Sequence, residues 1–138
     1  MIYSEYISRE TKGFNGYFDI TEDVKKIFAR SQLSAGLLTV HIAGATAGIV
    51  ITENEPGLLS DIIETLEMLS PQEALYHHDA KWRDGNGFSH IRSALIGSSK
   101  TIPFSSKSLL LGISQQIIFF DFDNRARSRK IFVQVLGE

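Results

Sequence analysis

The sequence predicts an α+β fold in a single domain that spans residues 1–138. Strand-like segments dominate both ends of the chain and helical patterns occupy its middle. That order favours α+β over a regular βαβ repeat. A length of 138 residues is typical of one domain, and a chain of this size buries enough surface to hold one core.

The N-terminal part begins with a strand, a turn and a second strand. Ile2–Ser8 alternates apolar and polar residues, which predicts a strand. Lys12–Gly16 has the composition of a turn, and Tyr17–Ile20 follows it as a short strand. Thr21 is then expected to cap a helix that runs to about Arg30, because apolar residues recur at helical spacing behind it.

The middle of the chain changes from strand to helix patterns. The apolar, β-branched runs Gly36–Ile42 and Gly48–Thr52 predict two strands. Gly57–Leu69 carries a wide apolar face at helical spacing and predicts a helix. Gln72–Gly87 has little periodicity and is interpreted as a long loop, which is often functional. Ser89–Ile96 is expected to be a short helix, ended by the glycine after it.

The C-terminal part is expected to consist of strands. Thr101–Phe104 and Leu109–Leu111 are two short ones. Gln115–Phe122 and Lys130–Leu136 are expected to pair as a hairpin with its turn at Asp123-Asn124.

Composition excludes several classes of protein. Hydrophobic residues make up 43% and charged residues 22%, which excludes disordered and collagen-like chains. The absence of cysteine excludes disulfides and thiolate sites. The longest apolar run, Gln116–Phe122, is interrupted by Asp121 and is too short for a membrane span. The N-terminus lacks a signal-peptide pattern, so a cytoplasmic protein is expected.

Charge argues against a general nucleic-acid binder, since the net charge is −2. A basic cluster nevertheless lies near the C-terminus, at Arg125, Arg127, Arg129 and Lys130. A solvated hairpin is the alternative interpretation.

Three polar places carry candidate functional residues. Glu53 and Asn54 follow an apolar strand, where a carboxylate and an amide are placed to face a pocket, unless they cap the next helix. Arg127 and Arg129 are two residues apart, so on a strand both point to one side and suit a phosphate or carboxylate. Pairing with Asp121 or Asp123 is the alternative role of these arginines.

The third place is rich in imidazole and carboxylate groups, which bind divalent metals and move protons near neutral pH. It contains His78 and His90 twelve residues apart, a spacing that fits no standard zinc motif. Asp79 either takes part directly in metal binding or proton transfer, or it holds a neighbouring histidine in one tautomer. Asp84–Gly87 is either part of the site or only a turn.

In chain order these residues resemble the YjbQ family of small proteins, of secondary thiamine-phosphate-synthase type. The similarity covers nearly the whole chain and each motif is weak alone, whereas the ordered set is specific. The matching segments are Gly44–Ala47, Ile49–Asn54, Tyr76–Asp79, Asp84–Ile91, Leu95–Gly97, Gly112–Gln115 and Arg127–Arg129.

The resemblance implies a β-sandwich-like sheet core with a few packed helices, and a homotrimer with a polar pocket near the subunit contacts. The implied reaction joins a pyrimidine methyl diphosphate to a thiazole phosphate and releases pyrophosphate. A divalent cation, Mg²⁺ or Zn²⁺, would stabilise the leaving group. The expected phosphorylated small-molecule site divides by role. Its catalytic candidates are Glu53, His78, Asp79 and His90, with His78 and His90 as metal ligands. Its substrate-binding candidates are Thr46, Asn54, Asn86, Gln115, Arg127 and Arg129.

The chain departs from the family pattern at the first motif histidine, where Gly44 stands. His41 lies at an odd offset and is expected on the opposite face of its strand, and His77 reaches inward only if its loop turns. Three functions therefore remain open: a weak transferase of the implied type, a catalytically degenerate trimer that binds an anion, and a metal-assisted phosphoesterase.

Overall fold

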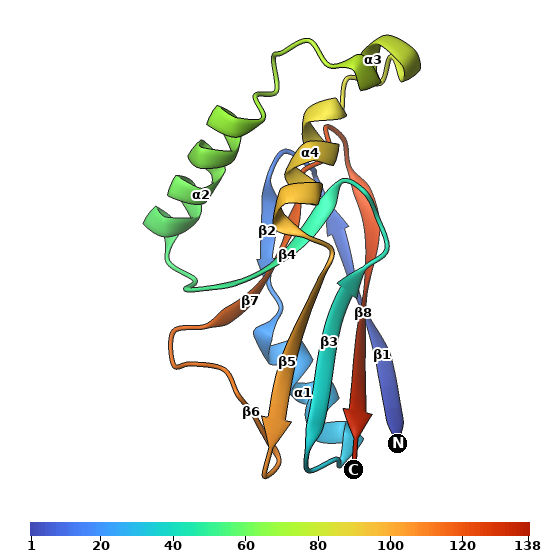
Figure 1. Ribbon diagram of the computed structural model, residues 1–138, viewed down its shortest axis with the longest axis vertical. Helices are drawn as coiled ribbons and strands as arrows, with labels where there is room; N and C mark the ends of the chain where they lie inside the picture. Colours follow the sequence, from blue (N-terminus) through green and yellow to red (C-terminus); the bar gives the residue numbers. More distant parts are fainter.

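The structure is a computed structural model that describes residues 1–138, and its strands form two antiparallel sheets (Figure 1). The larger sheet has the order β1-β8-β3-β5-β6 and the smaller sheet the order β2-β7-β4. The strands are β1 (Ile2–Thr11), β2 (Gly16–Asp19), β3 (Gly36–Ile42), β4 (Ala47–Thr52), β5 (Ser99–Ser105), β6 (Ser108–Leu109), β7 (Gln116–Asp121) and β8 (Arg127–Gly137). The helices are α1 (Thr21–Ser31), α2 (Pro56–Leu69), α3 (His77–Trp82) and α4 (Gly87–Ile96).

The main core lies between the larger sheet and a second layer made of the smaller sheet and α1. Alternation along β8 turns Ile131, Val133 and Val135 inward, where all three are fully buried. Val24 and Ile27 of α1 are buried at helical spacing against the same core. Burying a side chain of this size stabilises the fold by about 1.5–3 kcal/mol. The predicted α+β class is therefore confirmed, with two sheets packed around the main core.

A second apolar cluster covers the far side of the smaller sheet. Leu59 and Leu66 of α2 are buried there against Ile118 and Phe120 of β7. Because both faces of β7 are covered, its sequence is a continuous apolar run rather than an alternating one. No helix of the chain has the length and apolarity needed to cross a membrane.

The expected hairpin between the last two strands is wrong, because β7 and β8 belong to different sheets. β7 pairs with β2 and β4, whereas β8 pairs with β1 and β3. The connection between them is held by buried groups. Phe122 donates its backbone N–H to the Thr46 carbonyl at 2.9 Å, and Asp123 is fully buried. The chain thus passes from one sheet to the other at Asp123-Asn124, which was predicted to be the turn of a hairpin within one sheet.

Three helix starts also differ from expectation. Thr21 is the first residue of α1 rather than its cap. Its hydroxyl instead accepts from the Ile117 N–H at 2.8 Å and donates to Asp19 at 2.6 Å. At α2 the capping carboxylate is Glu55, which accepts from two backbone N–H groups. The segment expected as a long loop contains α3, and α4 begins two residues earlier than predicted.

Arg92 fixes α4 to the rest of the fold. Its side chain is fully buried and donates to the Ser70 carbonyl at 3.1 and 2.9 Å, to Asn15 at 2.8 Å, and to Glu67. Arg92 was not among the predicted site residues. Four hydrogen bonds to three residues hold α4 against the end of α2 and the turn between β1 and β2.

Candidate functional site

Most of the predicted site residues meet at one end of the two sheets, near the N-terminal ends of β4, β8 and α4 (Figure 1). We call this set the histidine–arginine cluster. Its members are Thr46, His78, Asp79, Asp84, Asn86, His90, Asp121, Asp123, Arg127 and Arg129.

Asp123 is the hub of the cluster. One of its carboxylate oxygens accepts from the Asn124 N–H at 2.8 Å and from the Asn86 amide at 3.3 Å. The other accepts from Arg127 Nε at 2.8 Å and from the Thr46 hydroxyl at 3.1 Å. Burial alone would raise the pKa of Asp123, but the hydrogen bonds from Arg127, Asn124 and Asn86 outweigh burial and hold that pKa below its usual range.

Arg129 is held by a second buried carboxylate. Its Nε and Nη2 atoms donate to the two oxygens of Asp121 at 2.8 and 3.0 Å. Nη2 also donates to the Thr46 hydroxyl at 2.7 Å, which connects Arg129 to the Asp123 hub. Both arginines therefore make the acidic pairs that were the alternative to phosphate binding. Arg127 still exposes a third of its side chain.

The two histidines lie against each other beside this network. The rings of His78 on α3 and His90 on α4 have centroids 4.5 Å apart. Asp79 accepts from the Gly87 N–H at 2.8 Å and from His78 Nδ1 at 3.2 Å. It therefore ties α3 to the start of α4 and orients the first histidine at the same time.

Three groups of the cluster could hold a cation. The ligand atoms of His78, Asp79 and Asp84 lie within 4.8 Å of one another. Nearby, the Oδ1 atom of Asn86 is buried and has no hydrogen-bond partner, although its amide nitrogen is fixed by Asp123. Imidazole and carboxylate ligands suit Zn²⁺ and Mg²⁺. The donor set that fits a cation thus includes two carboxylates, whereas the sequence predicted the His78 and His90 pair.

Three predicted site residues lie elsewhere. The register of β4 and β7 pairs Ala47 with Asp121 at one end and Thr52 with Gln116 at the other. Six strand residues span about 20 Å, so Glu53, Asn54 and Gln115 lie beyond the opposite end of the smaller sheet. A single copy of the chain therefore does not bring them to the histidine–arginine cluster, and the expectation that one hollow collects all candidates is wrong for the monomer.

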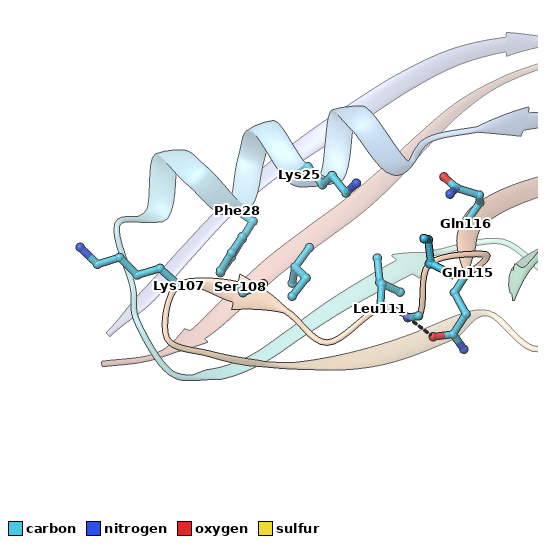
Figure 2. A pocket seen from close by; sticks show the side chains of 10 residues that line it. Lys25, Phe28, Lys107, Ser108, Leu111, Gln115 and Gln116 are labelled. Atoms are coloured by element: carbon cyan, nitrogen blue, oxygen red, sulfur yellow. Dashed lines mark hydrogen bonds between the residues drawn. The ribbon is translucent and has the colours of Figure 1, made fainter.

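The residues at that opposite end have local partners. The Asn54 amide donates to Asp19 at 2.9 Å, and Gln115 accepts from the Gly112 N–H at 2.8 Å. Gln115 also lines a hollow of about 430 Å³ between α1 and the segment around β6 (Figure 2). Lys25 and Phe28 border this hollow from α1.

No imidazole replaces the missing motif histidine at Gly44. His41 lies on β3 and its Nδ1 bonds to the Ser99 hydroxyl at the neighbouring strand. His77 is exposed and lines a hollow with Leu75 and Ala80. The space above Gly44 is bordered instead by Arg129, whose Nη1 lies 2.9 Å from the position of a Cβ at residue 44.

Sequence reasoning treated Asp121 and Asp123 only as alternative partners of the arginines and missed Asp123 as the hub. One signal was present. Both aspartates lie in or next to the apolar run that ends at Phe122, where an acid is buried only with strong partners.

The fold and the cluster define a small two-sheet α+β protein with a buried carboxylate–arginine network beside a histidine pair. The chain belongs to the YjbQ-like UPF0047 family, whose model matches residues 5–138. A UPF0047 protein of Methanothermobacter thermautotrophicus is 37% identical over 99% of this chain and 94% of its own length. The UPF0047 protein YugU of Bacillus subtilis is 28% identical over 86% of this chain and 88% of its own.

Solved structures agree with this assignment. A YbjQ-like protein of unknown function from Sulfolobus solfataricus matches with a TM-score of 0.89 and 25% identity, covering all of both chains. A protein of the same family from Clostridium acetobutylicum matches with a TM-score of 0.82 and 36% identity, over 94% of this chain and 99% of its own.

Proposed function

We propose that the protein binds a phosphorylated small molecule at the histidine–arginine cluster. The observation that carries the proposal is that Arg127 and Arg129 are fixed side by side by buried carboxylates, at the same end of the fold as His78 and His90. Guanidinium groups that are already ordered before the ligand arrives bind phosphate oxygens with a smaller loss of side-chain conformational entropy.

The reaction we propose is of thiamine-phosphate-synthase type, in which a pyrimidine methyl diphosphate joins a thiazole phosphate and pyrophosphate leaves. Departure of pyrophosphate builds negative charge on its oxygens, and donors held in place for that charge lower the barrier. A third of the Arg127 side chain is exposed, which leaves this residue accessible to a ligand. The histidine pair would hold or move a proton, since imidazole exchanges protons near neutral pH.

A divalent cation would lie at His78, Asp79 and Asp84, whose ligand atoms are close enough to share one ion. Bound there, it would add positive charge for the leaving group. Asp79 is already oriented for this role by the Gly87 N–H. We propose this ligand set in place of the His78 and His90 pair.

A second function, anion binding without turnover, is favoured by one observation. Gly44 supplies no acid or base, and the guanidinium of Arg129 lies where an imidazole at that position would begin. Hydrolysis of a phosphate ester is the third candidate, which the same groups support. Release of inorganic phosphate from a simple ester, assayed beside pyrophosphate release, separates these outcomes.

We also propose that the protein assembles as a homotrimer. The outer face of the larger sheet is covered by no helix and exposes Ile2, Tyr6, Leu37 and Leu136. In addition, Glu53 and Gln115 lie far from the histidine–arginine cluster of their own copy. In a trimer these residues would lie near the cluster of a neighbouring copy. Light scattering should give three times the chain mass, and a monomer mass would contradict this proposal.

The test of the proposed function is pyrophosphate binding by calorimetry, followed by an assay of pyrophosphate release from the two phosphorylated substrates. Arg127→Gln and His78→Ala are expected to lower affinity and turnover, respectively. Arg125→Gln is the matched control, because Arg125 is exposed and makes no ion pair. Wild-type protein that binds no pyrophosphate, or an Arg125 variant as impaired as the Arg127 variant, would overturn the proposal.

A further inference from the structure

Gly44 lies in the short connection from β3 to β4, and its backbone does not require a glycine. The glycines with left-handed φ values in this chain are Gly13, Gly36, Gly85 and Gly97, and Gly44 is not among them. An L residue could therefore adopt the same backbone conformation. The reason for glycine at this position must lie in the space around it.

That space is bordered by one charged group. A Cβ at residue 44 would lie 2.9 Å from Arg129 Nη1, and the next nearest atom is Ile42 Cγ1 at 4.0 Å. A carbon 2.9 Å from nitrogen is well inside van der Waals contact, so any side chain here would displace the guanidinium or cover it. Glycine leaves that face of the guanidinium open.

The guanidinium itself is not free to move aside. Its Nε and Nη2 atoms are bound by Asp121 and Thr46, both buried. Only 11% of the Arg129 side chain is exposed. Nη1 makes no hydrogen bond within the protein, so its two N–H groups remain available as donors. The fold therefore holds one end of Arg129 and presents the other beside Gly44.

A hollow lies next to this position, on the side of β1 and β8 that carries Ser8 and Lys130, and Gly44 is not among its lining residues. Arg129 and Ala43, the neighbour of Gly44, line this hollow of about 380 Å³. Lys130 and Ser8 also line it, with Glu10 as its single acid. Because Asp121 balances the charge of Arg129, recognition at Nη1 depends on hydrogen-bond geometry more than on net charge.

We propose that Gly44 and Nη1 of Arg129 form a notch that receives a non-bridging phosphoryl oxygen, with Gly44 as the residue that determines access. This inference rests on the proposed function and names the contact that would fix the phosphoryl group. A single added methyl group at residue 44 closes the notch, whereas the contacts of Asp123 with Arg127, Asn86 and Asn124 do not involve residue 44.

The experiment is calorimetric titration of inorganic pyrophosphate into wild-type protein and two variants. Gly44→Ala is expected to weaken binding about 10- to 100-fold, the effect of one lost hydrogen bond to a charged group. Ala45→Gly, which alters one methyl group at the exposed neighbouring residue, is the matched control and is expected to stay within about twofold. Urea unfolding of each variant shows whether the fold is unchanged.

The outcomes separate this inference from the proposed function. Pyrophosphate binding that is equal in wild-type and Gly44→Ala protein overturns the notch and leaves the proposed function standing. No binding by the wild-type protein overturns both. If Gly44→Ala is unfolded, the NMR signal of the Arg129 side-chain N–H groups in wild-type protein decides. The signal should shift on addition of pyrophosphate, and a signal that stays fixed at saturation would contradict the notch.

Discussion

Replacing Asp123 by asparagine tests the hub of the cluster while keeping the shape of the side chain. In the native protein both carboxylate oxygens accept, one from Arg127 and Thr46 and the other from Asn124 and Asn86. An asparagine turns one of these acceptors into an NH₂ group that faces donors. Whichever way the amide is oriented, two hydrogen bonds are lost and a charged partner of Arg127 is removed.

The expected loss of stability follows from the burial of this pair. Asp123 is fully buried, and removing one partner of a buried ion pair costs about 3–5 kcal/mol. Arg127 keeps a third of its surface exposed and regains some hydration, so the lower half of that range, about 3–4 kcal/mol, is expected. Combining Asp123→Asn with Arg127→Gln should cost less than the sum of the two single changes, by about 1 kcal/mol or more.

The assay is urea unfolding followed by circular dichroism at one protein concentration, because the apparent stability of the proposed trimer would depend on concentration. Asp61→Asn on the exposed surface of α2 is the control and should change stability by less than about 0.5 kcal/mol. A loss of less than about 1 kcal/mol in the free energy of unfolding for Asp123→Asn, or strict additivity with Arg127→Gln, would refute the central role of Asp123 in the cluster.

Three further predictions concern pH, the α4 anchor and a turn. Because the pKa of Asp123 is lower in the folded protein, its contribution to the free energy of unfolding is complete above the unfolded pKa and is lost as pH falls through the folded pKa. The free energy of unfolding of the wild-type protein, measured at a series of acid pH values, should therefore fall over this range. An equal dependence on pH in Asp123→Asn would contradict this prediction. Arg92→Met leaves the Ser70 carbonyl unpaired and should cost about 2–4 kcal/mol in urea unfolding; a cost under about 1 kcal/mol would contradict the anchoring role. Gly13 has φ +74°, and an added Cβ would lie 2.5 Å from the Asp123 carbonyl oxygen, so Gly13→Ala should destabilise by more than about 2 kcal/mol. Gly112→Ala, which meets only a flexible side chain, is its control, and equal melting temperatures for the two variants would contradict the turn.

Local structure could be predicted from the sequence wherever the pattern depends on near neighbours. The strand Gly36–Ile42 has the predicted bounds, and the apolar face of Gly57–Leu69 forms α2 as expected. The prediction of a C-terminal hairpin was wrong because turn residues do not show whether the two flanking strands belong to one sheet. That choice depends on Phe122 and Asp123 being buried against Thr46, a contact between distant parts of the chain.

The site was predictable only in part, for a similar reason. His78 and His90 meet because α3 and α4 pack, and Thr46 joins Arg129 through a contact 83 residues apart in sequence. Glu53 was expected to face a pocket because it follows the end of an apolar strand, but the length of β4 puts Glu53 and Thr46 beyond opposite ends of that strand. No sequence pattern could show that Arg129 borders Gly44.

A crystal structure of the protein grown with pyrophosphate tests the central claim most directly. We expect the anion to bind against Arg127 and Nη1 of Arg129, within reach of the histidine pair. Pyrophosphate bound instead in the hollow beside Gln115 and Lys107, with the arginines contacting only Asp121 and Asp123, would contradict it.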